Sequence, residues 1–207
     1  MNIHRIGHCC AVLLLCLPRC GVPADDCPAW RQVATGPEGS LFHRCRPGPF
    51  PGEVMIEREF RAAPERLFRL ANDYEAFEEF VPDVLDSRVL ARDGMVQWVY
   101  HRLHVPGPGA DRVYVIRSTR TAQGPRHWRV EWTLSERAFA AADLAAGVVP
   151  GALSGAWDIT RTAQGGSSAR YVLQIDPGGL VPDWLAQRLV DRYAERVMAA
   201  FRQRLGE

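Results

Sequence analysis

Residues 182–205 read PDWLAQRLVDRYAERVMAAFRQRL and predict the longest helix of the chain. Apolar side chains recur in it every four residues, at Leu185, Leu189, Tyr193, Val197, Phe201 and Leu205. This spacing places them on one face of an α-helix, and most of the charged side chains fall on the other face. At about 1.5 Å per residue the helix is roughly 36 Å long, which is enough to cross a whole β-sheet.

The segments before this helix carry the signals of a sheet. Strands are expected at residues 53–61, 84–91, 95–105, 112–120, 127–135, 152–161 and 169–176, with a shorter one near 41–46. Two short helices are expected after the strand at 53–61, one beginning at Pro64 and one over residues 73–81. Tight polar turns such as Asp93-Gly94 join successive strands, which favours antiparallel pairing. The chain is therefore predicted to be an α+β protein built on an antiparallel meander.

The first 24 residues have the layout of a secretory signal peptide. Arg5 lies in a short polar start, residues 9–17 form an apolar run, and Val22-Pro23-Ala24 ends in a small residue. An apolar run of this length is too short to span a bilayer as a helix. We expect a periplasmic or secreted protein, and the alternative is an uncleaved N-terminal anchor.

Removal of residues 1–24 leaves Cys27 and Cys45 as the remaining cysteines. In an oxidising compartment these two can form a disulfide, which would tie the new N-terminus to the segment near Arg46. Closing such a loop would stabilise the fold by about 3 kcal/mol. The alternative is a pair of free buried thiols.

The composition is that of one ordinary globular domain. The 207 residues are 47% hydrophobic and 24% charged, and their formal net charge is +1. Nucleic-acid binding is not expected, because a dedicated binder would show a basic excess.

Local sequences resemble the START lipid-transfer family of the helix-grip, or SRPBCC, superfamily. DPGGLVPDWL at residues 176–185 is similar to the family's entry into its final helix, and SGAW at 154–157 to its G-x-W strand. Residues 106–115 resemble its proline loop and the strand that follows, although Val113 stands where the family usually has Asp. The element order agrees as well, so the resemblance implies a helix-grip fold, in which a curved antiparallel sheet wraps around the long C-terminal helix.

The resemblance divides the chain and assigns it a function. After the signal peptide, residues 25–52 would form an N-terminal embrace and residues 53–207 a START-like ligand-binding domain of the bacterial exported type. The expected function is non-enzymatic carriage or sensing of a lipid, sterol or similar hydrophobic molecule in an internal cavity. The alternative is a cyclase- or aromatase-like enzyme that uses cavity groups such as Tyr114, Arg117 or Tyr171 for acid–base catalysis. A monomer without a cofactor is expected, with transient membrane contact during transfer, and residues Phe139, Leu144 and Val148 are expected in a gate loop over the cavity.

Strand parity and the resemblance together give the candidate ligand-binding residues. They are Trp98, Tyr100, Arg102, Tyr114, Arg117, Trp132, Trp157, Tyr171, Leu173, Leu185, Leu189 and Tyr193. At residues 112–118 the two criteria disagree. The resemblance places Tyr114 and Ser118 inside, whereas the apolar Val113 and Val115 favour the face that carries Arg117, and both faces stay open at this stage. Each apolar candidate can equally be packed core.

Other chemistry finds no support in the sequence. His101 and His104 lie three apart in an expected strand and so point to opposite faces, which disfavours a shared metal ion. Ser154 lacks the G-x-S-x-G setting of a nucleophile elbow. No metal site and no catalytic residue are therefore predicted.

Overall fold

The computed structural model describes residues 29–45, 52–105, 110–137, 147–176 and 183–207. The signal peptide at 1–24, Cys27, most of the proline loop and the DPGG turn lie outside these residues. No helix among the described residues is long and apolar enough to cross a membrane.

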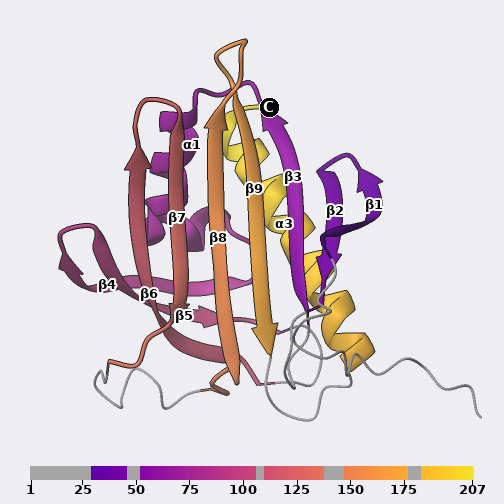
Figure 1. Cartoon of the computed structure of the whole chain (residues 1–207). Helices are drawn as coiled ribbons and strands as arrows, with labels where there is room; N and C mark the ends of the chain where they lie inside the picture. Colours follow the sequence, from indigo (N-terminus) through magenta and orange to yellow (C-terminus); the bar gives the residue numbers. More distant parts are fainter. Residues whose placement is uncertain (1–28, 46–51, 106–109, 138–146, 177–182) are drawn as a thin grey trace, which may run out of the picture.

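One antiparallel sheet of nine strands forms the body of the molecule (Figure 1). Its order is β1-β2-β3-β9-β8-β7-β6-β5-β4, so every strand except β3 and β9 pairs only with neighbours in sequence. The strands are β1 (Arg31–Gly36), β2 (Gly39–Arg44), β3 (Glu53–Phe60), β4 (Val84–Asp93), β5 (Val96–Leu103), β6 (Arg112–Gln123), β7 (His127–Leu134), β8 (Ala152–Arg161) and β9 (Ser167–Asp176). Figure 1 shows β4 and β5 turned across the direction of β7, β8 and β9, so the sheet is strongly curved.

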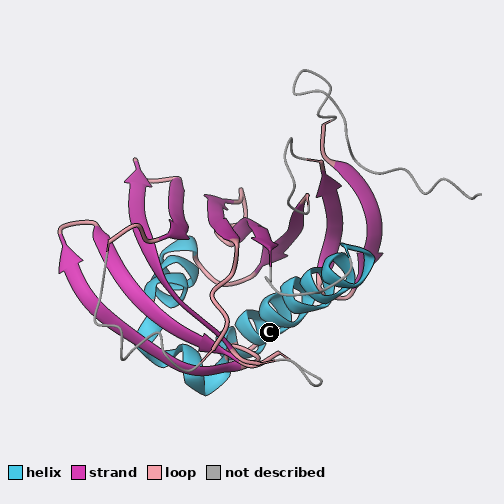
Figure 2. Cartoon of the chain, turned by 90° about the horizontal axis from the view of Figure 1, so that it is seen from below, coloured by secondary structure: helices cyan, strands magenta, loops and turns pink. Residues whose placement is uncertain are grey.

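The helices lie on one face of this sheet. They are α1 (Pro64–Asn72), the 3₁₀ turn η2 (Tyr74–Ala76), α2 (Phe77–Phe80) and α3 (Asp183–Leu205). α1 packs against β7 and β8, whereas α3 packs against β3 and β9. In Figure 2 the strands form an arc around the helices. The expected α+β helix-grip fold is thus confirmed.

The α3 helix approaches the sheet closely because its central buried positions are small. Its buried stripe runs through Ala186, Val190, Ala194, Val197, Met198, Phe201 and Leu205. The predicted stripe at Leu185, Leu189 and Tyr193 lies beside it and is only half-buried in this half of the helix. Ala194 is fully buried at the centre of α3, where its small side chain permits close packing against the strands, whereas Ala186 lines a hollow near the N-terminal end of the helix.

The N-terminal hairpin of β1 and β2 is joined to α3 by ionic contacts. Arg202 on α3 donates to both carboxylate oxygens of Glu38, at 3.1 and 3.0 Å. His43 Nε2 lies 2.8 Å from Asp191 Oδ1. The hairpin therefore extends the sheet and contacts α3 at two places, at Asp191 and near the C-terminal end at Arg202.

Two local expectations differ from the structure, and a third lies partly outside the described residues. The strand β1 was not predicted, because nearly all of its side chains are exposed and it carries no alternating apolar pattern. The helix expected over residues 73–81 is a 3₁₀ turn followed by one short α-helical turn. Cys45 is half-buried just after β2, but its expected partner Cys27 lies outside the described residues, so the disulfide stays a prediction.

Candidate functional site

A small cavity lies between the sheet and the helices. It is lined by Ala71, Tyr74, Phe77, Val81, Val84, His101, Leu103, Tyr114, Ile116, Trp132, Leu153, Trp157, Tyr171, Leu173, Ile175, Tyr193, Val197 and Phe201. Its volume is about 60 Å³. A water molecule occupies about 30 Å³ in the liquid, so this inner cavity has room for the tip of a ligand and not for a whole lipid.

Aromatic rings occupy most of the space that the fold leaves beneath α3. The ring of Trp157 lies 4.6 Å from that of Phe201 and 4.7 Å from that of Tyr171, between ring centroids. Phe80 adds a further ring 5.3 Å from Phe201. The large interior hollow expected from the fold is thus reduced to the inner cavity.

A larger hollow opens where the N-terminal half of α3 meets the ends of β5, β6 and β9. We call this hollow the mouth. Its volume is about 410 Å³, and it is lined by Asp83, Leu103, His104, Val105, Arg112, Ile175, Ala186, Leu189, Val190, Arg192, Tyr193, Glu195 and Arg196. Leu103, Ile175 and Tyr193 line both the mouth and the inner cavity. The two spaces therefore adjoin each other.

The mouth is lined by both charged and apolar side chains. Asp83 accepts two hydrogen bonds from Arg196, at 2.7 and 3.1 Å. Leu189 and Val190 of α3 supply apolar surface. A ligand at the mouth would therefore meet both hydrocarbon and charge.

The inner cavity contains a small group of polar side chains. Tyr74 Oη and Ser118 Oγ lie 2.8 Å apart and share a hydrogen bond. The ring of His101 lies 5.8 Å from that of Tyr74 and 5.6 Å from that of Tyr114. Burial lowers the pKa of His101 to about 4, so the imidazole is neutral at ordinary pH. Burial also raises the pKa of Tyr74 and of Tyr114, so both phenols keep their protons.

Six of the predicted ligand-binding residues line the inner cavity. They are Tyr114, Trp132, Trp157, Tyr171, Leu173 and Tyr193. Leu189 lines the mouth, whereas Leu185 is half-buried on α3 and lines neither space. Contact with a ligand stays a prediction for these residues.

The structure corrects the placement of four predicted residues. Trp98, Tyr100, Arg102 and Arg117 lie on the outer face of the sheet and do not line the inner cavity or the mouth. Strand parity was ambiguous here, because both faces of β5 and β6 are apolar. On the outer face, Tyr100, Val113 and Val115 are buried with Leu90 and Trp98 against them. Because this second cluster is apolar, the outer face of these strands has the same sequence pattern as a face that lines a cavity. The resemblance, which placed Tyr114 and Ser118 inside, predicted the orientation of β6 correctly.

Sequence reasoning missed His101 as a cavity residue. It was considered only as a metal ligand, although it shares the parity of Val99 and Leu103, which both face the core. That parity was the available signal. Among the described residues, no group of three His, Cys, Asp or Glu side chains is placed to hold a metal ion.

The gate-loop residues are described only in part. Phe139 and Leu144 lie outside the described residues. Val148 forms a parallel bridge with Arg112, in which Val113 N donates to Val148 O at 3.1 Å and Val148 N to Asp111 O at 2.8 Å. Since Arg112 lines the mouth, this end of the segment lies beside it.

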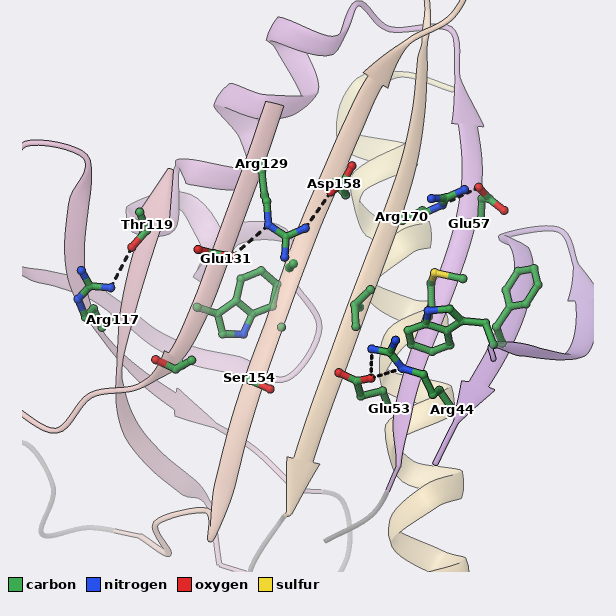
Figure 3. Close-up of a pocket in the computed structure, with 18 residues that line it drawn as sticks. Arg44, Glu53, Glu57, Arg117, Thr119, Arg129, Glu131, Ser154, Asp158 and Arg170 are labelled. Carbon is green, nitrogen blue, oxygen red and sulfur yellow. Dashed lines mark hydrogen bonds and ion pairs between the residues drawn. The ribbon is translucent and has the colours of Figure 1, made fainter. Parts of the chain in front are cut away.

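A third hollow, of about 670 Å³, lies on the outer face of the sheet (Figure 3). Its charged side chains are Arg44, Arg117, Arg129 and Arg170 with Glu53, Glu57, Glu131 and Asp158, so the two signs balance. In Figure 3, Arg129 lies between Glu131 and Asp158, at 3.0 and 2.8 Å. These side chains largely satisfy one another, and we regard the mouth with the inner cavity as the better candidate for an apolar ligand.

Comparison with known proteins agrees with this geometry. Residues 61–202 match the family described as polyketide cyclase / dehydrase and lipid transport. The chain belongs to this family. An uncharacterized protein of Pseudomonas aeruginosa is 26% identical to this family member over 136 residues, and the match spans 64% of each chain.

Solved structures of similar fold come from bacteria and from human. A STAR-related lipid transfer protein of Xanthomonas axonopodis has a TM-score of 0.75 and 23% identity, covering 86% of this chain and 99% of that one. Human StAR-related lipid transfer protein 5 has a TM-score of 0.71 and 12% identity, with 86% and 88% covered. The Zhui aromatase/cyclase of Streptomyces has a TM-score of 0.53 and 15% identity, with 74% and 94% covered. The fold of this family member is that of the START domains, and the fold is compatible with binding a hydrophobic ligand.

Proposed function

We propose that this protein binds one hydrophobic small molecule, such as a lipid or a sterol, at the mouth beside α3, and carries or senses it without catalysis. The observation that carries the proposal is the hollow of about 410 Å³ that adjoins the inner cavity at Leu103, Ile175 and Tyr193. Binding sites for small molecules usually have volumes of about 300–1,000 Å³, and the mouth falls in this range.

The energetics of burial support the same proposal. A ligand that buries roughly 300 Å² of apolar surface gains about 7 kcal/mol at 25 cal/mol per Å², before the costs of association. Micromolar binding corresponds to about 8 kcal/mol net, so burial of this area supplies a large part of the driving force, and further contacts must supply the rest. The family's description, which includes lipid transport, supports this use of the fold. The layout of residues 1–24 supports an exported carrier, and N-terminal sequencing of the mature protein from its own host would test the export.

A bulky substitution at the mouth tests the proposal. Leu189→Trp places a ring in the mouth and should weaken binding of the hydrocarbon probe diphenylhexatriene by about tenfold or more, equivalent to about 1.4 kcal/mol. Arg188→Trp is the matched control, because Arg188 is exposed on the same helix and lines neither space. Fluorescence titration measures both affinities, and native mass spectrometry of protein from its own host should show an apolar adduct. Absence of both adduct and probe binding, or equal binding by the two variants, would contradict the proposal.

An enzyme of the cyclase type is the second candidate, and the neutral His101 in the inner cavity favours it. A neutral imidazole can accept a proton from a ligand, although a pKa of about 4 makes His101 a weak general base. Against this function, the raised pKa values of Tyr74 and Tyr114 make both phenols poor acids, and Arg117 lies on the outer face. Turnover of a short β-polyketone thioester that is lost in His101→Phe would favour the enzyme over the carrier.

A further inference from the structure

We infer that the inner cavity binds one uncharged oxygen, a hydroxyl or a carbonyl, at the end of an otherwise apolar ligand, and that His101 recognises it. The inference rests on the proposed binding at the mouth and adds the class of ligand and its orientation. Such a ligand would enter oxygen first, with its hydrocarbon part in the mouth.

The hydrogen-bonding capacity of His101 is not used up by the protein. The side chain is only 5% exposed and lines the inner cavity from β5. Its Nδ1 atom is buried and has no hydrogen-bond partner among the described residues. Buried polar atoms are normally paired, so an unpaired one in a side chain that lines a cavity is consistent with a partner that comes from outside and reaches it after a small shift of the ring.

Several polar groups near His101 are already paired within the protein. Tyr74 and Ser118 share their hydrogen bond at 2.8 Å, and Ser87 Oγ donates to the backbone oxygen of Tyr74 at 2.5 Å. The ring of Tyr114 lies 5.6 Å from the imidazole, and its phenol is a second group that can bond a ligand oxygen. His101 is distinguished from these groups by its buried, unpaired Nδ1 atom.

The cavity selects against charged groups. None of its lining side chains is an arginine, aspartate or glutamate. A carboxylate or phosphate there would lose its hydration without gaining a counter-charge, which is strongly unfavourable. A neutral oxygen pays no such desolvation cost once it is hydrogen-bonded.

The neutral state of His101 suits both kinds of oxygen. A neutral imidazole has one N–H and one bare nitrogen, so Nδ1 can donate to a carbonyl or accept from a hydroxyl, according to the tautomer. Burial keeps the ring in this state, because it lowers the pKa to about 4. The inner cavity, of about 60 Å³, would hold the small polar tip of the ligand, and the mouth, of about 410 Å³, would hold its larger apolar body.

The test compares ligands that share one chain and differ only at the end. Diphenylhexatriene is bound to the protein that comprises residues 25–207 and is then displaced with 1-decanol, 2-decanone, decane or decanoate. We expect 1-decanol and 2-decanone to act at concentrations about tenfold lower than decane, a preference of about 1.4 kcal/mol, with decanoate weaker than both. His101→Phe keeps a ring against Phe77, which lies 6.1 Å from the imidazole, and should abolish the preference.

Two readouts separate the failure of this inference from that of the proposed function. If the wild-type protein does not bind diphenylhexatriene, binding at the mouth itself is wrong. If it binds the probe but 1-decanol is no better than decane, or if the preference survives in His101→Phe, the role of His101 is wrong and the carrier proposal stands. Titration of His101→Phe with the probe alone gives the reference affinity against which displacement by each ligand is calculated for that variant. His101→Leu serves as the apolar variant if His101→Phe does not fold, and His101→Gln should retain part of the preference because its amide can still form the hydrogen bond.

Discussion

At the scale of single residues, His101 makes stability depend on pH. Burial lowers its pKa to about 4, whereas an unfolded histidine titrates near 6.5. Between these values the unfolded chain binds more protons than the folded one, so the free energy of unfolding falls as the pH falls from about 6.5 toward 4. The loss attributable to this one residue is about 3 kcal/mol over that window.

Urea unfolding at a series of pH values measures this loss. As the pH falls from about 6.5 toward 4, the free energy of unfolding of wild type should decrease more than that of His101→Phe, because only wild type carries this imidazole. Carboxylates contribute equally to both proteins, so they cancel in the difference. Tyr114→Phe should keep the wild-type slope, since burial raises the pKa of that phenol further above the window. Parallel curves for wild type and His101→Phe would show that the imidazole is hydrated in the folded state.

At the scale of elements, the β8 strand requires glycine at position 155. A Cβ built there would collide with the Trp132 indole and lie 2.6 Å from the backbone oxygen of Val172. Trp132 lines the inner cavity, so the missing side chain is what allows the indole to lie across the strand. We expect Gly155→Ala to lower the free energy of unfolding by about 1–3 kcal/mol through overpacking.

Gly36→Ala is the control for Gly155→Ala. No atom lies within 4 Å of the Cβ position at Gly36, so this substitution should change stability by less than about 0.5 kcal/mol. Chemical denaturation followed by tryptophan fluorescence compares the two, and a shift in the emission of Gly155→Ala would report displacement of Trp132. Equal stability of the two variants would mean that the indole moves aside without cost.

Elements differ in how far the sequence could predict them. The α3 helix was predicted almost to the residue, because its apolar side chains repeat with the helical period. The bounds of the strands that face water on one side were predicted closely. The β1 strand was not predicted, because almost none of its side chains is buried and its sequence shows no apolar alternation. The face of β5 and β6 could not be decided by parity, since Tyr100 and Val113 pack on the outer side as tightly as Val99 and Ile116 do on the inner side.

At the scale of the whole molecule, packing and binding compete for the same interior. The resemblance predicted a hollow under α3, but its size depends on how close the helix lies and on which rings enter. The small side chain of Ala194 determines how close the helix lies, and the rings of Trp157 and Phe201 fill the space beneath it. Neither effect can be predicted from strand parity. Of the two spaces on the helix side of the sheet, the mouth holds most of the volume and the inner cavity is small, which favours stability over capacity.

Phe201→Ala tests this competition directly. Phe201 is 1% exposed and its ring contacts those of Trp157, Phe77 and Phe80, so its removal should lower the free energy of unfolding by about 3–5 kcal/mol. The space gained adjoins the inner cavity, so the variant should bind diphenylhexatriene more tightly than wild type. At a ligand concentration a hundred times the Kd, binding should restore about 2.7 kcal/mol of stability.

Phe42→Ala is the control, because it removes a half-buried ring from the outer hollow. It should lower the free energy of unfolding by less than Phe201→Ala does and leave probe binding unchanged. If Phe201→Ala is destabilised but binds the probe no better, the helix and sheet have closed over the gap. The limit on capacity would then lie in the approach of α3 to the sheet and not in the aromatic rings between them.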